Sequence, residues 1–435
     1  MRRFFILLFV LNVISAALFI GFVNRPVYDD PFNIFDVHNY ASRGLSVDTF
    51  LSHRNPPGPT GFLWMAAGVR LLGGEELRAA RIAILVSWIL LAAGILVGAR
   101  YSRFPQLWYG AMISTLVFPH AVEATATLLT EGPSLLFAVL GVLAWTEFAS
   151  RPDVTPGVFS LGILGGLSMG LAVTCRQYNL ALLPAAVCFA LYQRRKRGSG
   201  KELRWLVSVI LSLALAVVPA LVMILVWKGI SSPGMATGMS YKNWKAGVGL
   251  NFFRPLLASF YTVVYLVPLS FPAMTMQQLK PAMRWRTLLV ASLGGLAAAM
   301  FGASLLQPGP LRTLVHSASR VPAGEFMVLG LIAGVTIINT VALCNFLWNE
   351  RVIIFSNPLM IFALLVVVFF IAEQLGVGGN LPFYDRYILQ VAPFLGTIAF
   401  SLLPRLTYPR LAALVALSIV SHVMLWRYAF GIVVS

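Results

Sequence analysis

Charge is scarce in this 435-residue sequence: only 11% of the residues are Asp, Glu, Lys or Arg. Soluble domains carry about 25% charged residues, so the scarcity excludes an ordinary soluble protein. Cysteine is equally scarce. Its three residues (Cys175, Cys188 and Cys344) lie in or beside apolar runs. An odd number in such places predicts neither a disulfide framework nor a cysteine metal site.

Hydrophobic residues make up 59% of the chain. Apolar runs of about 20 residues recur along its whole length, which is the length a helix needs to cross a bilayer. We therefore expect an all-α polytopic membrane protein, a single integral membrane domain over residues 1–435 with about thirteen transmembrane helices. The expected spans are 4–23, 80–98, 104–122, 129–148, 156–174, 178–193, 205–227, 255–274, 288–306, 326–348, 352–373, 387–404 and 410–430.

The net charge of +17 could suggest a nucleic-acid partner, but most of the excess lies in short loops between the expected spans. A bilayer explains that distribution better, because basic residues accumulate in cytoplasmic loops. The strongest cluster, residues 194–204, then marks a basic cytoplasmic loop. This predicts a cytoplasmic N-terminus, an external C-terminus and no nucleic-acid partner.

The first outer loop, residues 24–79, is the longest polar stretch of the chain. Its pattern predicts an interfacial helix over residues 34–45 with Asp36 on the solvent side, and a second short helix over 60–73. A solvated loop is the alternative, and the neighbouring Asp29 and Asp30 fit it. A carboxylate on a membrane-facing helix is costly, which favours a function for Asp36.

Two further residues carry chemistry at expected span ends. Glu131 opens the span 129–148, where an acid could equally serve the helix dipole. Arg176 interrupts two spans within "TCRQYNLALLP". It could extend to the membrane interface, but its position opposite several acids favours an anion site.

Several motifs resemble GT-C superfamily glycosyltransferases, protein mannosyltransferases and aminoarabinose transferases among them. The resemblance rests on Asp36-x-x-x-Tyr40-Ala41-x-x-Gly44, followed by "NPPGPTGFLW" and "GGEELRAARIA". In addition, "RQYNLALLP" is similar to the glucosyltransferase that completes dolichol-linked oligosaccharides, and "YDRYILQVAPF" to a late Arg-Tyr motif of such enzymes.

This resemblance implies a multi-span fold, a sugar donor on polyprenyl phosphate, and an acceptor (glycan, lipid or protein) that arrives from the outer side. It implies an acidic general base, and Asp36 and Glu131 match the two acids. Relatives often have lysine before the double proline, where this chain has Asn55. Which residue holds the phosphate therefore stays open. The candidates for substrate binding are Asp30, His53, Arg54, Asn55, Arg176, Gln177, Asn179, Tyr384, Asp385 and Arg386.

No metal or other cofactor is expected. No DxD-like nucleotide-sugar motif or Gly-rich phosphate loop occurs on the cytoplasmic side, which argues against a soluble nucleotide donor. The setting implied is a bacterial inner membrane, with membrane lipids as partners and the active site outside. The alternatives are a ligase or polymerase of lipid-linked glycans, a transporter or flippase, and a non-catalytic assembly subunit. Transporters often show related halves, and we find no internal repeat.

Overall fold

The structure is a computed structural model of the chain. It describes all residues except 28, 56–57, 103, 152, 197–201, 230–231, 235–249, 302–305, 307–309, 377–384, 428 and 431–435. Within helices, the side chains of 202, 298–299, 301, 310, 353–354 and 385 are also outside the description. The prediction for Tyr384, the side chain of Asp385 and the pair Pro56-Pro57 therefore lie outside the described residues.

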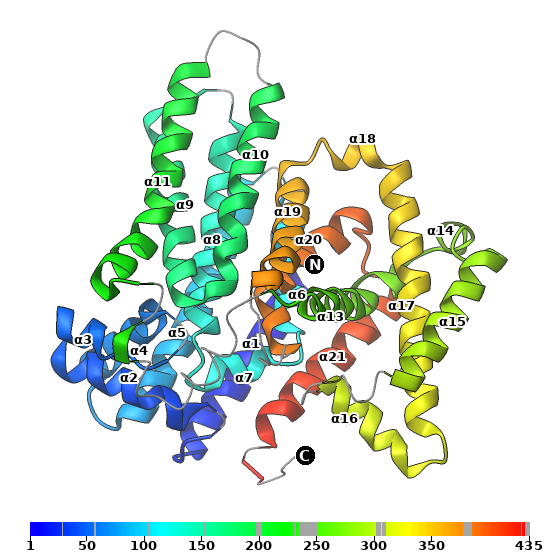
Figure 1. Ribbon diagram of the computed structural model, residues 1–435, viewed down its shortest axis with the longest axis horizontal. Coiled ribbons are helices and arrows are strands. Elements are labelled where there is room, and N and C mark those ends of the chain that lie inside the picture. Colours follow the sequence, from blue (N-terminus) through cyan, green and yellow to red (C-terminus); the bar gives the residue numbers. More distant parts are fainter. Residues whose placement is uncertain are drawn as a thin grey trace.

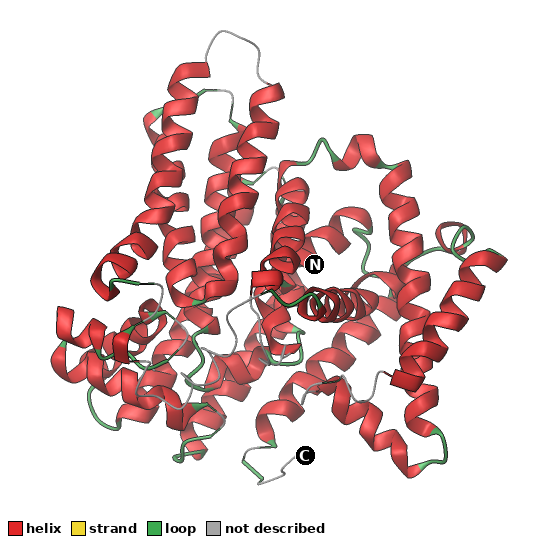
Figure 2. Ribbon diagram, in the orientation of Figure 1, coloured by secondary structure: helices red, strands yellow, loops and turns green. Residues whose placement is uncertain are grey.

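The described residues are helical and contain no strand (Figure 2). The first half consists of α1 (Arg2–Phe22), α2 (Asp30–Arg43), α3 (Val47–Leu51), α4 (Pro59–Leu72), α5 (Glu76–Tyr101), α6 (Pro105–Leu116), α7 (Ala121–Ala126), α8 (Glu131–Ser150), α9 (Pro156–Cys175), η1 (Gln177–Ala181), α10 (Leu182–Lys196) and α11 (Glu202–Trp227). The second half consists of α13 (Phe253–Ser270), η3 (Phe271–Ala273), α14 (Met276–Leu279), α15 (Trp285–Phe301), α16 (Pro310–Ser317), η5 (Ala318–Arg320), α17 (Gly324–Asn349), α18 (Arg351–Ile354), α19 (Pro358–Glu373), η6 (Gln374–Gly376), η7 (Asp385–Gln390), α20 (Ala392–Leu402) and α21 (Tyr408–Trp426).

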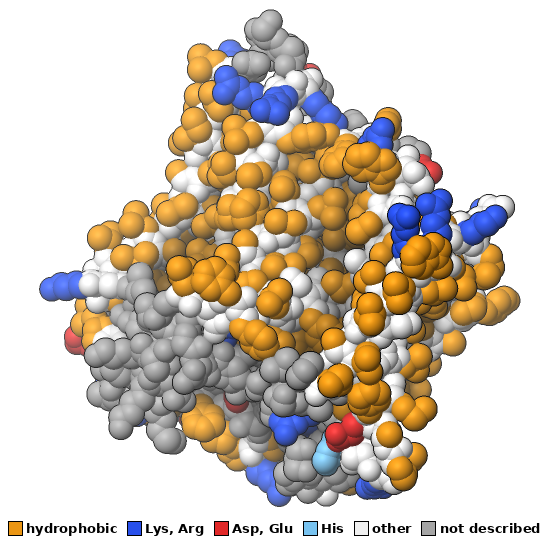
Figure 3. Space-filling model, turned by 45° about the vertical axis from the view of Figure 1, so that its right-hand side comes forward, with side chains coloured by type: hydrophobic (Ala, Val, Ile, Leu, Met, Phe, Trp, Pro, Cys, Tyr) orange, Lys and Arg blue, Asp and Glu red, His pale blue; other side chains and the backbone are white. Residues whose placement is uncertain are grey.

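Long apolar helices dominate this architecture (Figure 1). Among the described residues, nine helices are long and apolar enough to cross a membrane. The surface in Figure 3 shows the matching pattern, a broad hydrophobic area with most of its Lys and Arg side chains toward the upper and lower ends. The prediction of an integral, multi-pass, all-α membrane protein is confirmed.

All thirteen expected spans coincide with helical segments, although five of these are shorter or broken. The expected span 104–122 divides into α6 and α7, with Pro119 in the interruption. Proline lacks the amide donor that a continuous helix needs. The expected span 352–373 divides into α18 and α19, which has 16 residues, or 19 with η6. The remaining short helices are α10 with 15 residues, α15 with 17 and α20 with 11.

The first loop, residues 24–79, contains three helices, α2, α3 and α4, where the sequence pattern predicted two. Helix α2 begins earlier than expected and packs against α4, which in turn contacts α5 and α9. The expectation that Asp36 faces solvent is wrong, because its side chain is buried. The exposed residues of α2 include the aromatic rings of Phe32 and Phe35. The helix thus turns aromatic surface outward and its acid toward the following loop.

Helices α8, α9 and α11 pack closely because small residues line their contact. A Cβ at Gly166 of α9 would lie 2.0 Å from the carbonyl oxygen of Ser212 in α11. On the other side of α9, a Cβ at Gly165 would lie 2.7 Å from the backbone nitrogen of Trp145 in α8. Such backbone-to-backbone packing is typical of membrane helices. This close packing fixes the positions of the residues at the ends of α8 and α9.

Candidate functional site

Asp36 holds the chain between α3 and α4 in place. Its Oδ1 accepts a hydrogen bond from the backbone N–H of Arg54 at 3.0 Å. Its Oδ2 accepts from the backbone N–H of Asn55 at 3.0 Å and from Asn55 Nδ2 at 2.7 Å. The buried His53 places its Nδ1 3.4 Å from the same oxygen. Asp36, His53 and Asn55 therefore form one buried anchor. The sequence predicted all three as site residues, but in the structure their polar atoms face one another.

Asp30 forms a second buried anchor, between the first loop and the helices below it. Its Oδ2 accepts from Arg81 Nη2 at 2.6 Å and from the backbone N–H of Val27 at 3.1 Å. Its Oδ1 accepts from the backbone N–H of Leu128 at 2.6 Å. Burial raises the pKa of Asp30, and the Arg81 guanidinium opposes that rise. With both oxygens engaged, the carboxylate fastens α2 to the start of α5 and to the α7–α8 connection.

Three arginines from distant parts of the chain form what we call the arginine cluster: Arg176, Arg254 and Arg386. Arg176 follows α9 and donates from Nη2 to Glu131 Oε1 at 2.5 Å. Arg386 lies in η7 and donates from Nη1 to Asp29 Oδ2 at 2.7 Å. Two of the three guanidiniums, those of Arg176 and Arg386, therefore each donate to a carboxylate.

Aromatic residues and an amide tie the cluster together. Arg254, in the first turn of α13, is buried and donates from Nη2 to Gln374 Oε1 at 3.0 Å. The rings of Tyr178 and Tyr387 lie 4.5 Å apart, centroid to centroid. Tyr178 interacts electrostatically with Arg254 and Arg176, and Arg176 with Arg386 and Tyr387. These residues therefore share one site, built where η1, η7, α8 and α13 meet.

The accessibility of the acids differs strongly across this region. The side chain of Asp29 is 33% exposed and that of its partner Arg386 is 13% exposed. Glu131 is only 4% exposed, and Asp36 is fully buried. Asp29, in its pair with Arg386, is therefore the most exposed of these acids.

Glu131 nevertheless keeps a binding capacity. Its Oε2 and the Oγ1 of the preceding Thr130 are buried and have no hydrogen-bond partner among the described residues. Buried polar atoms are usually paired, so such atoms beside an ion pair are suited to the hydroxyl groups of a bound ligand.

The other predicted site residues have different surroundings. Arg54 is exposed and lies over the ring of Phe35 at 3.7 Å, and none of its contacts among the described residues joins it to the cluster. Asn179 donates from Nδ2 to Ser134 Oγ at 2.7 Å and to the Ala172 carbonyl at 2.9 Å, which locks η1 onto α8 and α9. Gln177 is exposed beside them.

Arg254, Gln374, Tyr178 and Tyr387 were not predicted as site residues, and Asp29 was assigned to a solvated loop. Arg254 carried one usable signal, since it is a lone cation at the start of an apolar run, as Arg176 is at the end of one. Nothing in its local sequence shows that α13 places it beside η1 and η7, because that proximity depends on long-range packing.

Comparison with known proteins gives little beyond these observations. No family model matches the sequence, and no curated protein sequence matches it. The fold is similar to two crystal structures of ArnT from Cupriavidus metallidurans, one bound to undecaprenyl phosphate and one in the apo state. They share 16% and 18% sequence identity with this chain, with TM-scores of 0.40 and 0.39. Both comparisons cover 95% of this chain and 77% of the other. At TM-scores below 0.5 these likenesses assign no function, which must be argued from the residues of the chain itself.

Proposed function

We propose that the protein is a membrane glycosyltransferase that transfers a sugar from a polyprenyl-phosphate carrier to an acceptor at the outer membrane face. One observation carries the proposal: a cluster of three arginines lies beside a partly exposed carboxylate, Asp29. Guanidinium groups suit phosphate because their fork geometry matches its oxygens. The carboxylate supplies the base that activation of an acceptor hydroxyl requires.

The chemistry follows from this pairing. The acceptor hydroxyl oxygen attacks the anomeric carbon of the sugar while its proton passes to Asp29. The bond between that carbon and the phosphate oxygen breaks, and the electron pair leaves on the phosphate. The arginine cluster stabilises the negative charge that develops on the phosphate. Such electrostatic stabilisation of the transition state is usually the largest single contribution to catalysis. Glu131 Oε2 is available to hold a sugar hydroxyl.

Asp29 replaces Asp36 as the proposed base for a geometric reason. A general base must lie within hydrogen-bond reach of the proton it takes. Asp36 is buried and already accepts bonds from the residues 54 and 55 that follow it in the loop. Asp29 is partly exposed and paired with Arg386, and a donor phosphate that binds Arg386 would release its carboxylate.

A place for the lipid tail lies along the same helix that carries Arg254. An apolar cavity of about 400 Å³ opens between α13, α16, α17 and α21. Val264, Pro268, Leu331 and Leu417 are among its lining residues. Val264 and Pro268 lie ten or more residues along α13 from Arg254, which is about 15 Å or more at the rise of an α-helix. Leu331 and Leu417 lie on α17 and α21. A chain of isoprene units could therefore extend from a phosphate at the cluster into this cavity.

The rival functions differ in the donor. A ligase or polymerase of lipid-linked glycans would use a diphosphate-linked chain, while a transporter would transfer nothing. The charges of this chain lie at helix ends, whereas a transporter places its site near the midplane. The acceptor class, whether glycan, lipid or protein, is to be found by experiment.

The test is incubation of the purified protein with radiolabelled polyprenyl-phosphate sugars and a membrane extract, followed by identification of the labelled product. A parallel reaction contains the diphosphate-linked form. Label that moves from the monophosphate donor alone supports the proposal. Transfer from the diphosphate donor alone would assign the chain to the ligase class, and label that crosses the membrane of a sealed vesicle unreacted would make it a transporter.

A further inference from the structure

A chain of neutral hydrogen bonds joins the elements that carry the arginine cluster. Ser134 Oγ, in α8, accepts from Asn179 Nδ2 of η1 at 2.7 Å and donates to Gln390 Oε1 of η7 at 2.9 Å. All three side chains are buried, with at most 3% of each residue exposed. We call Asn179, Ser134 and Gln390 the serine bridge, because the hydroxyl of Ser134 takes part in both bonds.

The serine bridge is close in sequence to the charged groups of the site. Each of its members lies three or four residues after a charged residue: Ser134 after Glu131, Asn179 after Arg176, and Gln390 after Arg386. The backbone N–H of Asn179 also donates to the Arg176 carbonyl at 3.0 Å. Each bond of the bridge therefore fixes a short backbone segment that also carries a charge of the site.

Two of these segments need such support. Both η1 and η7 are short 3₁₀ helices, whose internal hydrogen bonds have poorer geometry than those of an α-helix. The like charges of Arg176 and Arg386 also repel one another. Arg176 is held against this repulsion by its bond to Glu131. A bridge of neutral groups resists the repulsion without adding a negative charge that would compete with a bound anion.

Arg386 depends on the serine bridge more strongly than Arg176 does. Its bond to Asp29 is the one that a donor phosphate would replace in the proposed reaction. The position of η7 then has to come from other contacts. Among the described residues, the bond from Ser134 is the one that orients the Gln390 side chain, because Gln390 Nε2 is buried without a partner.

We propose that Ser134 and Gln390, supported by Asn179, are positioning residues that hold Arg386 beside Arg176 for contact with one donor phosphate. The bridge keeps the two like charges together before the ligand arrives, so binding does not have to bring them together. Such preorganisation increases affinity by lowering the cost of binding. This inference rests on the proposed donor site.

The test is equilibrium binding of polyprenyl phosphate to the purified protein in detergent. Ser134→Ala removes the oxygen that both bonds share, and it should weaken binding about fivefold to tenfold, the net value of about one hydrogen bond. Gln390→Met keeps the length of the side chain but lacks the acceptor oxygen, and it should weaken binding in the same range. Thermal unfolding shows which variants are folded, and either variant alone can carry the test.

A double-mutant cycle separates positioning of Arg386 from a general structural effect. In an Arg386→Ala background, Ser134→Ala should leave the affinity for polyprenyl phosphate unchanged, because the residue that the bridge positions is missing. Gln390→Met should likewise have no further effect in that background. An equal loss of affinity with and without Arg386 would show that the bridge does not act through this arginine, and would overturn the proposal.

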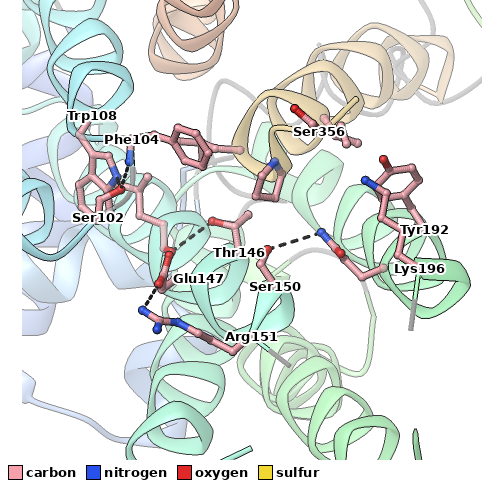
Figure 4. A pocket seen from close by; sticks show the side chains of 15 residues that line it. Ser102, Phe104, Trp108, Thr146, Glu147, Ser150, Arg151, Tyr192, Lys196 and Ser356 are labelled. Atoms are coloured by element: carbon pink, nitrogen blue, oxygen red, sulfur yellow. Dashed lines mark hydrogen bonds and ion pairs between the residues drawn. The ribbon is translucent and has the colours of Figure 1, made fainter. Parts of the chain in front are cut away.

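Ser150→Ala is the matched control, because Ser150 lies on the same helix and also bonds a glutamine. Its Oγ accepts from Gln193 Nε2 at 3.5 Å, at a separate cavity of about 250 Å³ (Figure 4). Ser150 is 16 residues from Ser134 along α8, about 24 Å at the rise of an α-helix. Its variant should bind polyprenyl phosphate as the parent does.

The outcomes distinguish this inference from the proposed function. A parent that binds polyprenyl phosphate, with equal affinity in Ser134→Ala, Gln390→Met and Ser150→Ala, would overturn the positioning role and leave the donor site in place. A parent that binds no polyprenyl phosphate would overturn both proposals.

Discussion

The identity of the base is decided by two aspartates seven residues apart. Asp29→Asn should bind donor as the parent does but lose transfer by about 10²–10⁴-fold, because the amide cannot accept the proton. Asp36→Asn should lower thermal stability instead, because an amide group cannot accept all the loop hydrogen bonds made by both oxygens. The measurements are the initial rate with radiolabelled donor and the unfolding temperature.

The opposite pattern would restore the assignment made from the sequence. If Asp29→Asn transfers sugar within a few-fold of the parent, while Asp36→Asn is folded, stable and inactive, Asp36 is the base.

Two arginines, Arg386 and Arg54, offer a matched comparison for phosphate binding. Arg386 and Arg54 each lie over an aromatic ring, Tyr387 and Phe35, but only Arg386 joins the arginine cluster. A charge-assisted hydrogen bond is worth about 1.5–3 kcal/mol, so Arg386→Ala should weaken donor binding by about tenfold to a hundredfold. Arg54→Ala should change it little. Equilibrium binding of polyprenyl phosphate measures both, and a larger loss in Arg54→Ala would favour the first loop as the phosphate site.

At the scale of elements, the contact between α9 and α11 can be tested with two glycines of the same helix. Gly166→Ala would place a Cβ 2.0 Å from the Ser212 carbonyl oxygen, so α11 has to move. Gly157→Ala meets nothing within 4 Å. We expect Gly166→Ala to lower stability by about 1–3 kcal/mol, as over-packing does, and Gly157→Ala to leave it unchanged or slightly higher. Thermal unfolding in detergent would refute the packing argument if both variants melted alike.

The sequence predicted the positions of the helices better than any other feature of the structure. Apolar length is a local property, so each expected span coincides with a helical segment, and the break near Pro119 was missed only because the flanking residues are apolar too. The predicted orientation of α2 was wrong, because an amphipathic pattern does not show which neighbouring segment covers the polar face of the helix. Here the loop residues Arg54 and Asn55 fold back over Asp36.

The site was predictable only in part, for the same reason. Glu131 and Arg176 were singled out as candidates, and the structure pairs them across 45 residues of sequence. Arg254 donates a hydrogen bond to Gln374, which is 120 residues away. The sequence around either residue does not predict this contact. Contacts of that range depend on how the helices pack, which hydropathy does not encode.

At the scale of the whole molecule, the untested expectation is the topology. The basic loop 194–204 should be cytoplasmic and the first loop, residues 24–79, external. In a variant without Cys175, Cys188 and Cys344, a cysteine at Ser199 should react with a membrane-impermeant maleimide only after the membrane is opened. A cysteine at the exposed Ser42 should react in intact cells. Reaction of both from the same side would exclude the proposed arrangement.

The ion pair between Asp29 and Arg386 joins residues 357 positions apart. During synthesis, the first loop and its aspartates emerge long before the arginine that completes the pair. A nascent chain therefore lacks one of the three guanidiniums until almost every helix has been inserted. If the arginine cluster is the donor site, as we propose, a chain that ends before Arg386 should not bind the donor phosphate as the complete cluster does.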